Sequence, residues 1–365
     1  MKFLIRFLFL AVLLASAPAS AVIDVYVDTD VSGGDADGTS WANAYSSLNV
    51  AQVAEQTNLV TATDYMIIHC QASSGTADTT VMTLDYPSWI TSDAYYLQIQ
   101  CDDISSPGVW DSTAYRIDTT TNDQIIESQL MHVRLIGLQL RTNQDKATVV
   151  IRGTAAADGD RGEIYIEDCI LISTSATNAY DYGISIDDTY LDTYISNTVV
   201  YGFSGTNTGG GIKLADGTDY SNIWAYNNTV IDCYNGYTDD GATGAEMYIK
   251  NNVSFGCTDA YNGTFGAGSV NNAYDEGSDP GSSGVDISSD DGTALFKDYN
   301  SDDFHVKDTD SSLYQAGADL DADANLAVTD DIDGDSRHAT TPCIGADEYD
   351  AGTPATPANF QIIFF

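Results

Sequence analysis

Two aspartates and one lysine are the best candidates for catalytic chemistry in this sequence. Asp187 and Asp188 follow an apolar segment at 183–186, and Lys213 lies inside the equivalent segment of the next repeat. A lysine base beside a cation-neutralised uronate suits a polysaccharide lyase, whereas two close carboxylates suit a glycoside hydrolase. Adjacent residues of a strand point to opposite faces, so the two aspartates need not act together. The simpler interpretation is that all three are solvated loop residues.

Aspartates also cluster in turns that are typical of cation-binding loops. Alternating carboxylates around a glycine turn offer the oxygen ligands that Ca²⁺ prefers, although no EF-hand is present because the bidentate glutamate is missing. Acidic turns closed by their own side-chain hydrogen bonds explain the same spacing. Ca²⁺ is the only cofactor that the sequence suggests. The candidate ligands are Asp28, Asp30, Asp35 and Asp37 near the N-terminus and Asp331, Asp333 and Asp335 near the C-terminus, with a further cluster at Asp319, Asp321 and Asp323.

Histidine and cysteine add little to this chemistry. None of the 4 histidines has a serine or cysteine partner at a recognisable spacing, which disfavours a hydrolytic triad. The 6 cysteines lie far apart without a CxxC or Cys/His pattern, so a zinc site is not predicted. Buried thiols and one or two disulfide bonds are both compatible with an exported chain.

The N-terminus predicts export. Lys2 and Arg6 flank the start of an apolar run at 7–14, and Ala19-Ser20-Ala21 matches a signal-peptidase site. The run is shorter than the roughly 20 residues that span a bilayer, and no later segment is long enough. We therefore expect a cleaved signal peptide, a secreted or cell-surface location and no transmembrane segment in the mature chain. An uncleaved anchor is the alternative.

Charge and composition exclude two further classes of protein. With 13 basic and 54 acidic residues the chain carries a formal net charge of −41, which repels the phosphates of nucleic acids. Intrinsic disorder is disfavoured, because 43% of the residues are hydrophobic and tyrosine alone occurs 23 times.

The elements that must position the candidate residues form a repeat. Short β-type phrases recur every 24 to 31 residues, with small or amide residues in one column where the chain must bend tightly. Their period of two, rich in Ile, Val, Tyr and Thr, favours strands over helices. The phrases are VRLIGLQL at Val133, IYIEDCILI at Ile164, TYISNTVVYG at Thr193, WAYNNTVIDC at Trp224 and YIKNNVSFGC at Tyr248, and the column is Gly137, Asp168, Asn197, Asn228 and Asn252.

We interpret the repeat as an all-β solenoid, a single-stranded right-handed parallel β-helix in which the amide column stacks into a ladder. Terminal coils need caps that cover their open strand edges, and the amphipathic segment 41–57 predicts a short N-terminal capping helix. The expected division is a signal peptide at 1–21, an N-terminal strand and capping helix at 22–64, the β-helix at 65–293, a C-terminal closing module at 294–349, and a linker with a short apolar tail at 350–365.

Three passages carry a resemblance to a known family. Residues 26–48, YVDTDVSGGDADGTSWANAYSSL, resemble the start of secreted β-helix proteins of the pectin-lyase-like class, and residues 108–118 are similar to β-helix proteins of bacteria and their viruses. The stretches FKDYNSDDFHVKDTDSSLYQAGADL and DIDGDSRHATTPCIGADEY look like a choice-of-anchor Q ending. The resemblance implies a parallel β-helix over nearly all of the mature chain. No anchor domain is recognisable after Tyr349, and the family is functionally mixed.

A non-catalytic glycan-binding, adhesion or surface-structural protein is the function that we expect first. Tyrosine rings stack on sugars and amides bind hydroxyl groups, whereas no convincing catalytic set is present. The alternative is a polysaccharide lyase or glycoside hydrolase that acts on an acidic polysaccharide. The tyrosines expected to contribute to glycan binding are Tyr180, Tyr182, Tyr190, Tyr194, Tyr201, Tyr234 and Tyr237.

Overall fold

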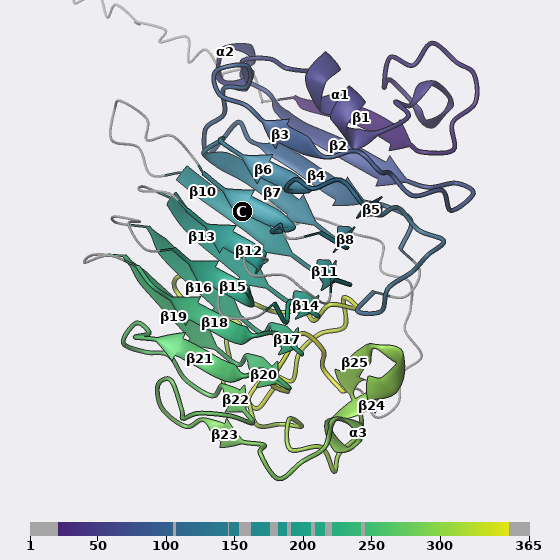
Figure 1. The fold of residues 1–365 in the computed structure, drawn as a ribbon. Coiled ribbons are helices and arrows are strands. Elements are labelled where there is room, and N and C mark those ends of the chain that lie inside the picture. Colours follow the sequence, from purple (N-terminus) through teal and green to yellow (C-terminus); the bar gives the residue numbers. More distant parts are fainter. Residues whose placement is uncertain are drawn as a thin grey trace, which may run out of the picture.

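The computed structural model describes most of the chain after residue 20 (Figure 1). Most of the predicted signal peptide, the predicted tail at 350–365 and the candidate residue Asp188 lie outside the described residues. The described ranges are 21–104, 107–144, 146–152, 162–175, 182–187, 191–205, 209–215, 221–241 and 245–349.

Three parallel sheets, which run side by side along one axis, make up the body of the molecule (Figure 1). Sheet 1 consists of β1 (Val22–Asp28), β2 (Tyr65–Gln71), β4 (Leu97–Cys101), β7 (His132–Ile136), β10 (Gly162–Glu167), β13 (Leu191–Ser196), β16 (Asn222–Tyr226) and β19 (Glu246–Lys250). Sheet 2 consists of β5 (Ile117–Thr119), β8 (Gln139–Thr142), β11 (Ile170–Ser173), β14 (Val199–Tyr201), β17 (Thr229–Ile231), β20 (Val253–Phe255), β22 (Ala273–Tyr274) and β23 (Val285–Asp286). Sheet 3 consists of β3 (Met82–Leu84), β6 (Ile126–Ser128), β9 (Val149–Ile151), β12 (Tyr182–Ile186), β15 (Gly210–Leu214), β18 (Asn235–Asp239) and β21 (Asp259–Gly263).

From β4 to β21 each coil contributes one strand to each sheet in turn, and every strand pair within the three sheets is parallel. The period of two places apolar side chains inside the coil at matching positions of successive strands. Leu135, Ile166 and Ile195 are such a stack on sheet 1, each 1% exposed or less. The predicted all-β parallel β-helix is therefore confirmed.

The predicted column of bend residues is correct in the coils nearer the N-terminus, as far as Asn197. In the coils that follow, which are the lower coils of Figure 1, it is wrong by one residue. Strand register pairs Ser196 with Tyr226, so Asn197 lies above Asn227 and not above Asn228. The residues at this bend with left-handed backbone angles are Gly137, Asp168, Asn197, Asn227, Asn251 and Asn271. The prediction failed because two adjacent asparagines occupy each lower bend, and spacing alone does not distinguish them.

The second asparagine of each lower bend points inward and forms the ladder. The side-chain oxygen of Asn252 accepts hydrogen bonds from the backbone N–H and the amide of Asn228, at 2.9 and 3.1 Å. Asn272 accepts from Asn252 in the same way, at 3.1 Å for both bonds. The Asn252 amide also donates to the carbonyl of Ala225 at 2.7 Å. These fully buried amides satisfy backbone groups that the bend would leave unpaired.

The first asparagine of the bend points outward and holds the C-terminal part of the chain. Asn251 makes two hydrogen bonds with the backbone of Ala318, and Asn271 donates to the carbonyl of Ala316. Asn197 donates to the carbonyl of Asp330. The C-terminal part itself contains α3 (Gly292–Leu295), η2 (Tyr299–Ser301) and the antiparallel hairpin of β24 (Phe296–Asp298) and β25 (Asp303–Val306). Its apolar residues, Phe304 among them, pack on the outer face of sheet 2 (Figure 1).

The capping helix predicted at the N-terminal end is present as α1 (Leu48–Ala54), which is preceded by η1 (Trp41–Asn43) and followed by α2 (Leu59–Ala62). Ser47 caps α1 by accepting a hydrogen bond from the N–H of Val50. Leu48 is buried, and its N–H donates to Asp78 at 2.8 Å. The helix thus covers the apolar end of the first coil.

The structure also bears on two expectations from the sequence, which concern disulfide bonds and membrane-spanning segments. All six cysteines are free thiols, and five of them are buried, so the structure supports the thiol alternative over disulfide bonds. Among the described residues, no helix has the length and apolar character needed to cross a membrane.

A column of small residues lets sheet 3 lie close against sheet 2. Strand register aligns Gly183, Gly211, Gly236 and Ala260 on successive coils. A methyl group on Gly211 would lie 2.4 Å from a methyl carbon of Val230 and 2.6 Å from the carbonyl oxygen of Gly236. Among these four positions, only Ala260 on the lowest coil carries a Cβ atom.

We predict that Gly211→Ala lowers the free energy of unfolding by about 1–3 kcal/mol, because the backbone of the next coil is closely packed and cannot move to make room for the methyl group. Chemical denaturation of the two proteins measures the difference. Ala260→Gly, at the lowest coil of the same column, is the control and should cost less. Equal stability of Gly211→Ala and the wild type would contradict the close approach.

Candidate functional site

The outer face of sheet 1 carries an aromatic row. Tyr165, Tyr194, Trp224 and Tyr248 occupy matching positions on four successive strands. Their rings stack at centroid distances of 4.7, 4.9 and 5.8 Å, with interplanar angles of 14°, 10° and 8°. Arg134 extends the stack upward, since its guanidinium carbon lies 5.0 Å from the Tyr165 ring centroid. The ring faces therefore contact one another, and only ring edges face outward.

A polar row runs beside the aromatic row, two residues earlier on each strand. Glu163, Asp192, Asn222 and Glu246 are paired in register on the same four strands. Glu246 is exposed and the other three are partly exposed. The Asn222 amide donates to Asp192 at 3.1 Å, and the Tyr165 hydroxyl donates to Glu163 at 3.2 Å. The row thus offers one hydrogen-bonding side chain per coil, at the strand spacing of about 4.8 Å.

Glu163 is the electrostatically unusual member of the polar row. Burial raises the pKa of its carboxyl group above the ordinary 4.5, and the nearby carboxylates of Asp93 and Asp192 raise it further. The hydrogen bond from Tyr165 and the charge of Arg134 oppose this effect without cancelling it. Sequence spacing did not single out this residue. The signal that could have found it is the alternation of EIYIE, DTYIS, NIWAY and EMYIK, which aligns the two rows.

The C-terminal part covers the lower end of the aromatic row. Leu320, Leu326 and Val328 pack against Trp224, which is 8% exposed, and against Tyr226, which is fully buried. Asp323 forms an ion pair with Lys250 of β19 at 2.5 Å. Asp323, which belongs to the acidic cluster at 319–323, is thus paired with a lysine.

The predicted catalytic residues have different partners in the structure. Asp187 forms an ion pair with Arg152 at 3.3 Å and accepts a hydrogen bond from Ser185 at 2.6 Å. Lys213 donates to the Tyr182 hydroxyl and lies 3.4 Å from the Asp240 carboxylate. These contacts raise the pKa of Lys213 against the opposing effect of burial, so the amine is protonated at neutral pH. A lyase base must be unprotonated, so the arrangement does not favour Lys213 in that role.

The predicted N-terminal calcium ligands accept hydrogen bonds from the protein itself. The buried carboxylate of Asp28 accepts from Gln71 and Ser73, and Asp30 accepts from the N–H groups of Ser74 and Thr76. Asp37 accepts from Thr39, and Asp35 lies in an exposed turn. These are the interactions of acidic turns, and calcium binding by these residues stays a prediction.

The predicted C-terminal calcium ligands point in different directions. One oxygen of Asp331 accepts from the N–H groups of Asp333 and Asp335, and the other accepts from the N–H of Glu348. Burial and the carboxylate of Asp347 raise the pKa of Asp331 to about 7. The ion-pair partner of Asp333 is His305, and the three aspartates do not form a group of ligand atoms within 4.8 Å of one another.

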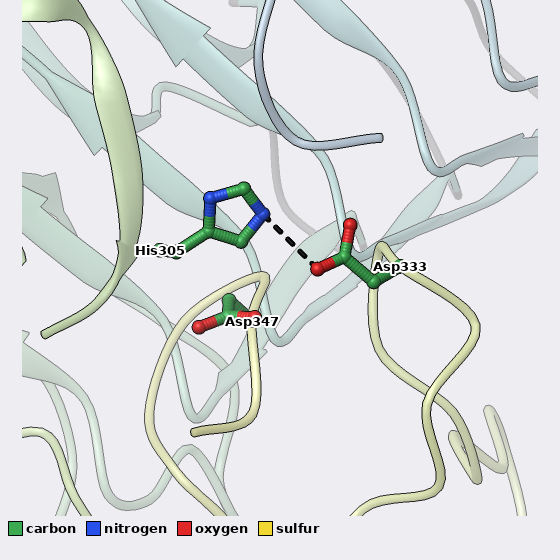
Figure 2. A group of neighbouring side chains, drawn as sticks. All are labelled: His305, Asp333 and Asp347. Atoms are coloured by element: carbon green, nitrogen blue, oxygen red, sulfur yellow. Dashed lines mark ion pairs between the residues drawn. The ribbon is translucent and has the colours of Figure 1, made fainter. Parts of the chain in front are cut away.

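His305 gathers a different set of carboxylates around it (Figure 2). Its Nδ1 lies 2.5 Å from Asp303, and its Nε2 lies 3.1 Å from Asp333, with Asp347 beside them. Burial alone would lower the pKa of His305, but the ion pairs with Asp303 and Asp333 outweigh it and raise the pKa to about 10. Sequence analysis missed this residue because its partners are 28 and 42 positions away in the sequence.

Most of the tyrosines expected to contact a glycan have structural roles. Tyr237 is fully buried, Tyr182 is nearly so, and Tyr201 packs against Phe304. Tyr194 belongs to the aromatic row, and Tyr234 is partly buried. Tyr180 and Tyr190 lie outside the described residues.

Comparisons with known proteins were made by sequence and by structure. No family model matches the chain, and no curated protein matches it. Among solved structures, the crystal structure of pectate lyase Pel9A aligns with 91% of this chain and 97% of its own, at 15% identity and a TM-score of 0.35. Such a loose superposition does not relate individual residues of the two proteins. The assignment to a parallel β-helix therefore rests on the strand pairing described above.

The raised pKa of Glu163 gives a testable effect on stability. A carboxyl group whose pKa is higher in the folded chain stabilises the fold below its unfolded pKa, and that contribution is lost as the pH rises through the folded value. Glu163→Gln removes the cost of the buried charge. The variant should therefore melt at a higher temperature than the wild type at pH 7, and the gain should disappear at about pH 4.

Thermal melting at the two pH values measures this difference. Glu276→Gln, which changes an exposed carboxylate elsewhere, controls for the change in net charge. If Glu163→Gln melts below the wild type at pH 7, the carboxylate has a stabilising partner and the assignment of its raised pKa to burial is wrong.

Proposed function

We propose that this chain is an exported, non-catalytic glycan-binding protein, and that the polar row on sheet 1 contacts the glycan. The observation that carries the proposal is the regular placement of Glu163, Asp192, Asn222 and Glu246 on successive coils. The sequence features of the N-terminus support export.

The spacing of the polar row suits an extended chain of sugars. Parallel strands lie about 4.8 Å apart, which is close to the length of one hexose residue in an extended polysaccharide. A glycan that lies along the solenoid axis would therefore meet one polar side chain per sugar. Carboxylates accept hydrogen bonds from sugar hydroxyl groups, and the amide of Asn222 both donates and accepts.

The charge of the chain favours a neutral glycan. A net charge of −41 and the three carboxylates of the polar row repel uronate groups. Recognition relies on hydroxyl groups and not on stacking, because the ring faces of the aromatic row are occupied by neighbouring rings. The row instead stiffens the surface on which the polar side chains stand.

Binding to an array of neutral and anionic polysaccharides tests the proposal. We expect a neutral polysaccharide to bind, and Asp192→Ala and Asn222→Ala each to weaken it about 3- to 10-fold, the effect of one or two hydrogen bonds. Asn262→Ala, on β21 of sheet 3, is the matched control and should bind like the wild type. An array without hits, or row variants with unchanged affinity, would refute the proposal.

A second candidate function is glycoside hydrolysis, which one observation favours. Glu163 and Asp192 lie side by side on adjacent strands, and burial raises the pKa of Glu163 above its ordinary value. Two carboxylates about 5 Å apart, one of them protonated, are the arrangement of retaining glycosidases.

Release of reducing ends from the polysaccharide that binds separates the two functions. Glycan binding without release, unchanged after long incubation, supports the non-catalytic proposal. Release by the wild type that Glu163→Gln and Asp192→Asn both abolish would assign the hydrolase function instead, with Glu246→Gln as the control on the same row.

A further inference from the structure

We infer that His305, Asp333 and Asp347 form a binding site for one divalent transition-metal ion of the zinc or manganese class. One ligand atom from each residue lies within 4.8 Å of the other two, and no other group of three such side chains occurs among the described residues (Figure 2). The site is independent of the polar row and of the function proposed for it.

The three ligands come from three segments that backbone hydrogen bonds hold in place. His305 belongs to β25, and Asp347 is tied to the same strand because one of its oxygens accepts from the N–H of Val306 at 2.6 Å. Asp333 lies in the turn whose backbone Asp331 fixes at 3.0 Å. Each carboxylate therefore keeps an oxygen for a ligand without further folding.

The orientation of His305 is that of a metal-bound histidine. Its Nδ1 faces the carboxylate of Asp303, and its Nε2 faces Asp333. Histidines that bind a metal nearly always donate the other ring N–H to a carboxylate or carbonyl, which fixes the tautomer and turns the ring. The Nε2 atom is buried and its ion-pair partner is the Asp333 carboxylate, so a metal ion would take the place of the proton between them.

A neighbouring loop keeps this nitrogen accessible to an ion. Gly108, in the connection between β4 and β5, adopts a positive φ of 79°. A Cβ atom at this position would lie 2.7 Å from Nε2 of His305, in the space beside the ligand nitrogen. Glycine leaves that space open and satisfies the left-handed backbone at the same time.

The ligand set and the distances determine the class of metal. One imidazole nitrogen with two carboxylates suits zinc or manganese, whereas calcium takes six to eight oxygen ligands. Bonds of about 2.0–2.2 Å to a tetrahedral ion place neighbouring ligand atoms about 3.3–3.6 Å apart. Nε2 of His305 and the Asp333 carboxylate, which are 3.1 Å apart as an ion pair, would separate slightly to admit the ion.

The surrounding charges favour a cation. Three carboxylates, those of Asp303, Asp333 and Asp347, lie beside His305, and the amine of Lys297 is paired with Asp303. A bound dication would offset the excess negative charge.

Metal titration of the untagged full chain tests the inference. After treatment with EDTA and desalting, Zn²⁺ or Mn²⁺ should bind with one equivalent per chain in calorimetry and raise the melting temperature, and Ca²⁺ should not replace it. His305→Gln should abolish this binding, and Asp303→Asn should weaken it about 10- to 100-fold through the lost orientation of the ring.

A matched histidine provides the control. His69 also lies between two aspartates, at 2.7 Å from Asp102 and 3.1 Å from Asp24, but has no third ligand group. His69→Gln should therefore bind the metal like the wild type. Because His305→Gln can fail to fold, the visible spectrum of Co²⁺ added to the wild type gives an independent readout of nitrogen and oxygen coordination.

The metal-binding measurements test the site at His305 separately from the proposed glycan binding. Absence of stoichiometric Zn²⁺, Mn²⁺ or Co²⁺ binding, or binding that His305→Gln leaves unchanged, overturns the inference and makes His305 a buried ion pair. Glycan affinity measured on the same samples stands apart, because the polar row does not include these residues.

Discussion

Hydrogen bonds between buried amides at one bend are the interaction on which the lower half of this molecule depends. Each parallel coil must turn sharply, and each turn leaves backbone groups that the sheets cannot pair. Asn228, Asn252 and Asn272 satisfy those groups and join each coil to the next. Their partners one position earlier, Asn251 and Asn271, face outward and hold the C-terminal part. The aromatic row and the polar row on sheet 1 repeat once per coil of the same stack.

The fold could be predicted from the sequence because its signal is repeated. Strand phrases of period two, small or amide residues at the bends and polar connections occur in every coil, so errors in one coil are corrected by the others. The error at Asn228 and Asn252 arose where this redundancy fails. Asn227 and Asn228 are both compatible with the bend, and only strand register shows which one has the left-handed backbone and which one points inward.

The candidate sites could be predicted only in part, because they depend on which side chains meet across coils. Asp187 and Lys213 were named together as catalytic candidates, but Arg152 and Asp240 provide their ion pairs. The sequence assigned no role to His305, because the carboxylates that lie beside it come from separate turns. Asp333 was named as a cation ligand, and its proposed partners are His305 and Asp347 in place of Asp331 and Asp335.

The outer face of sheet 1 and the C-terminal part form two separate surfaces of the molecule. Sheet 1 presents the polar row on a stiff aromatic support, and the C-terminal part covers sheet 2 and the lower end of that row. The cluster around His305 lies in this covering part and links β25 to two later turns. The surface proposed to bind a glycan and the C-terminal part that covers sheet 2 thus belong to separate elements.

Hydrogen exchange at single backbone amides tests the central claim most directly. Because Asn252 accepts the N–H of Asn228, that N–H should be among the slowest to exchange in the wild type, and in Asn252→Ala its exchange should accelerate at least tenfold more than that of strand amides in the upper coils. Unchanged protection at Asn228 in the variant would contradict the role given to the buried amides.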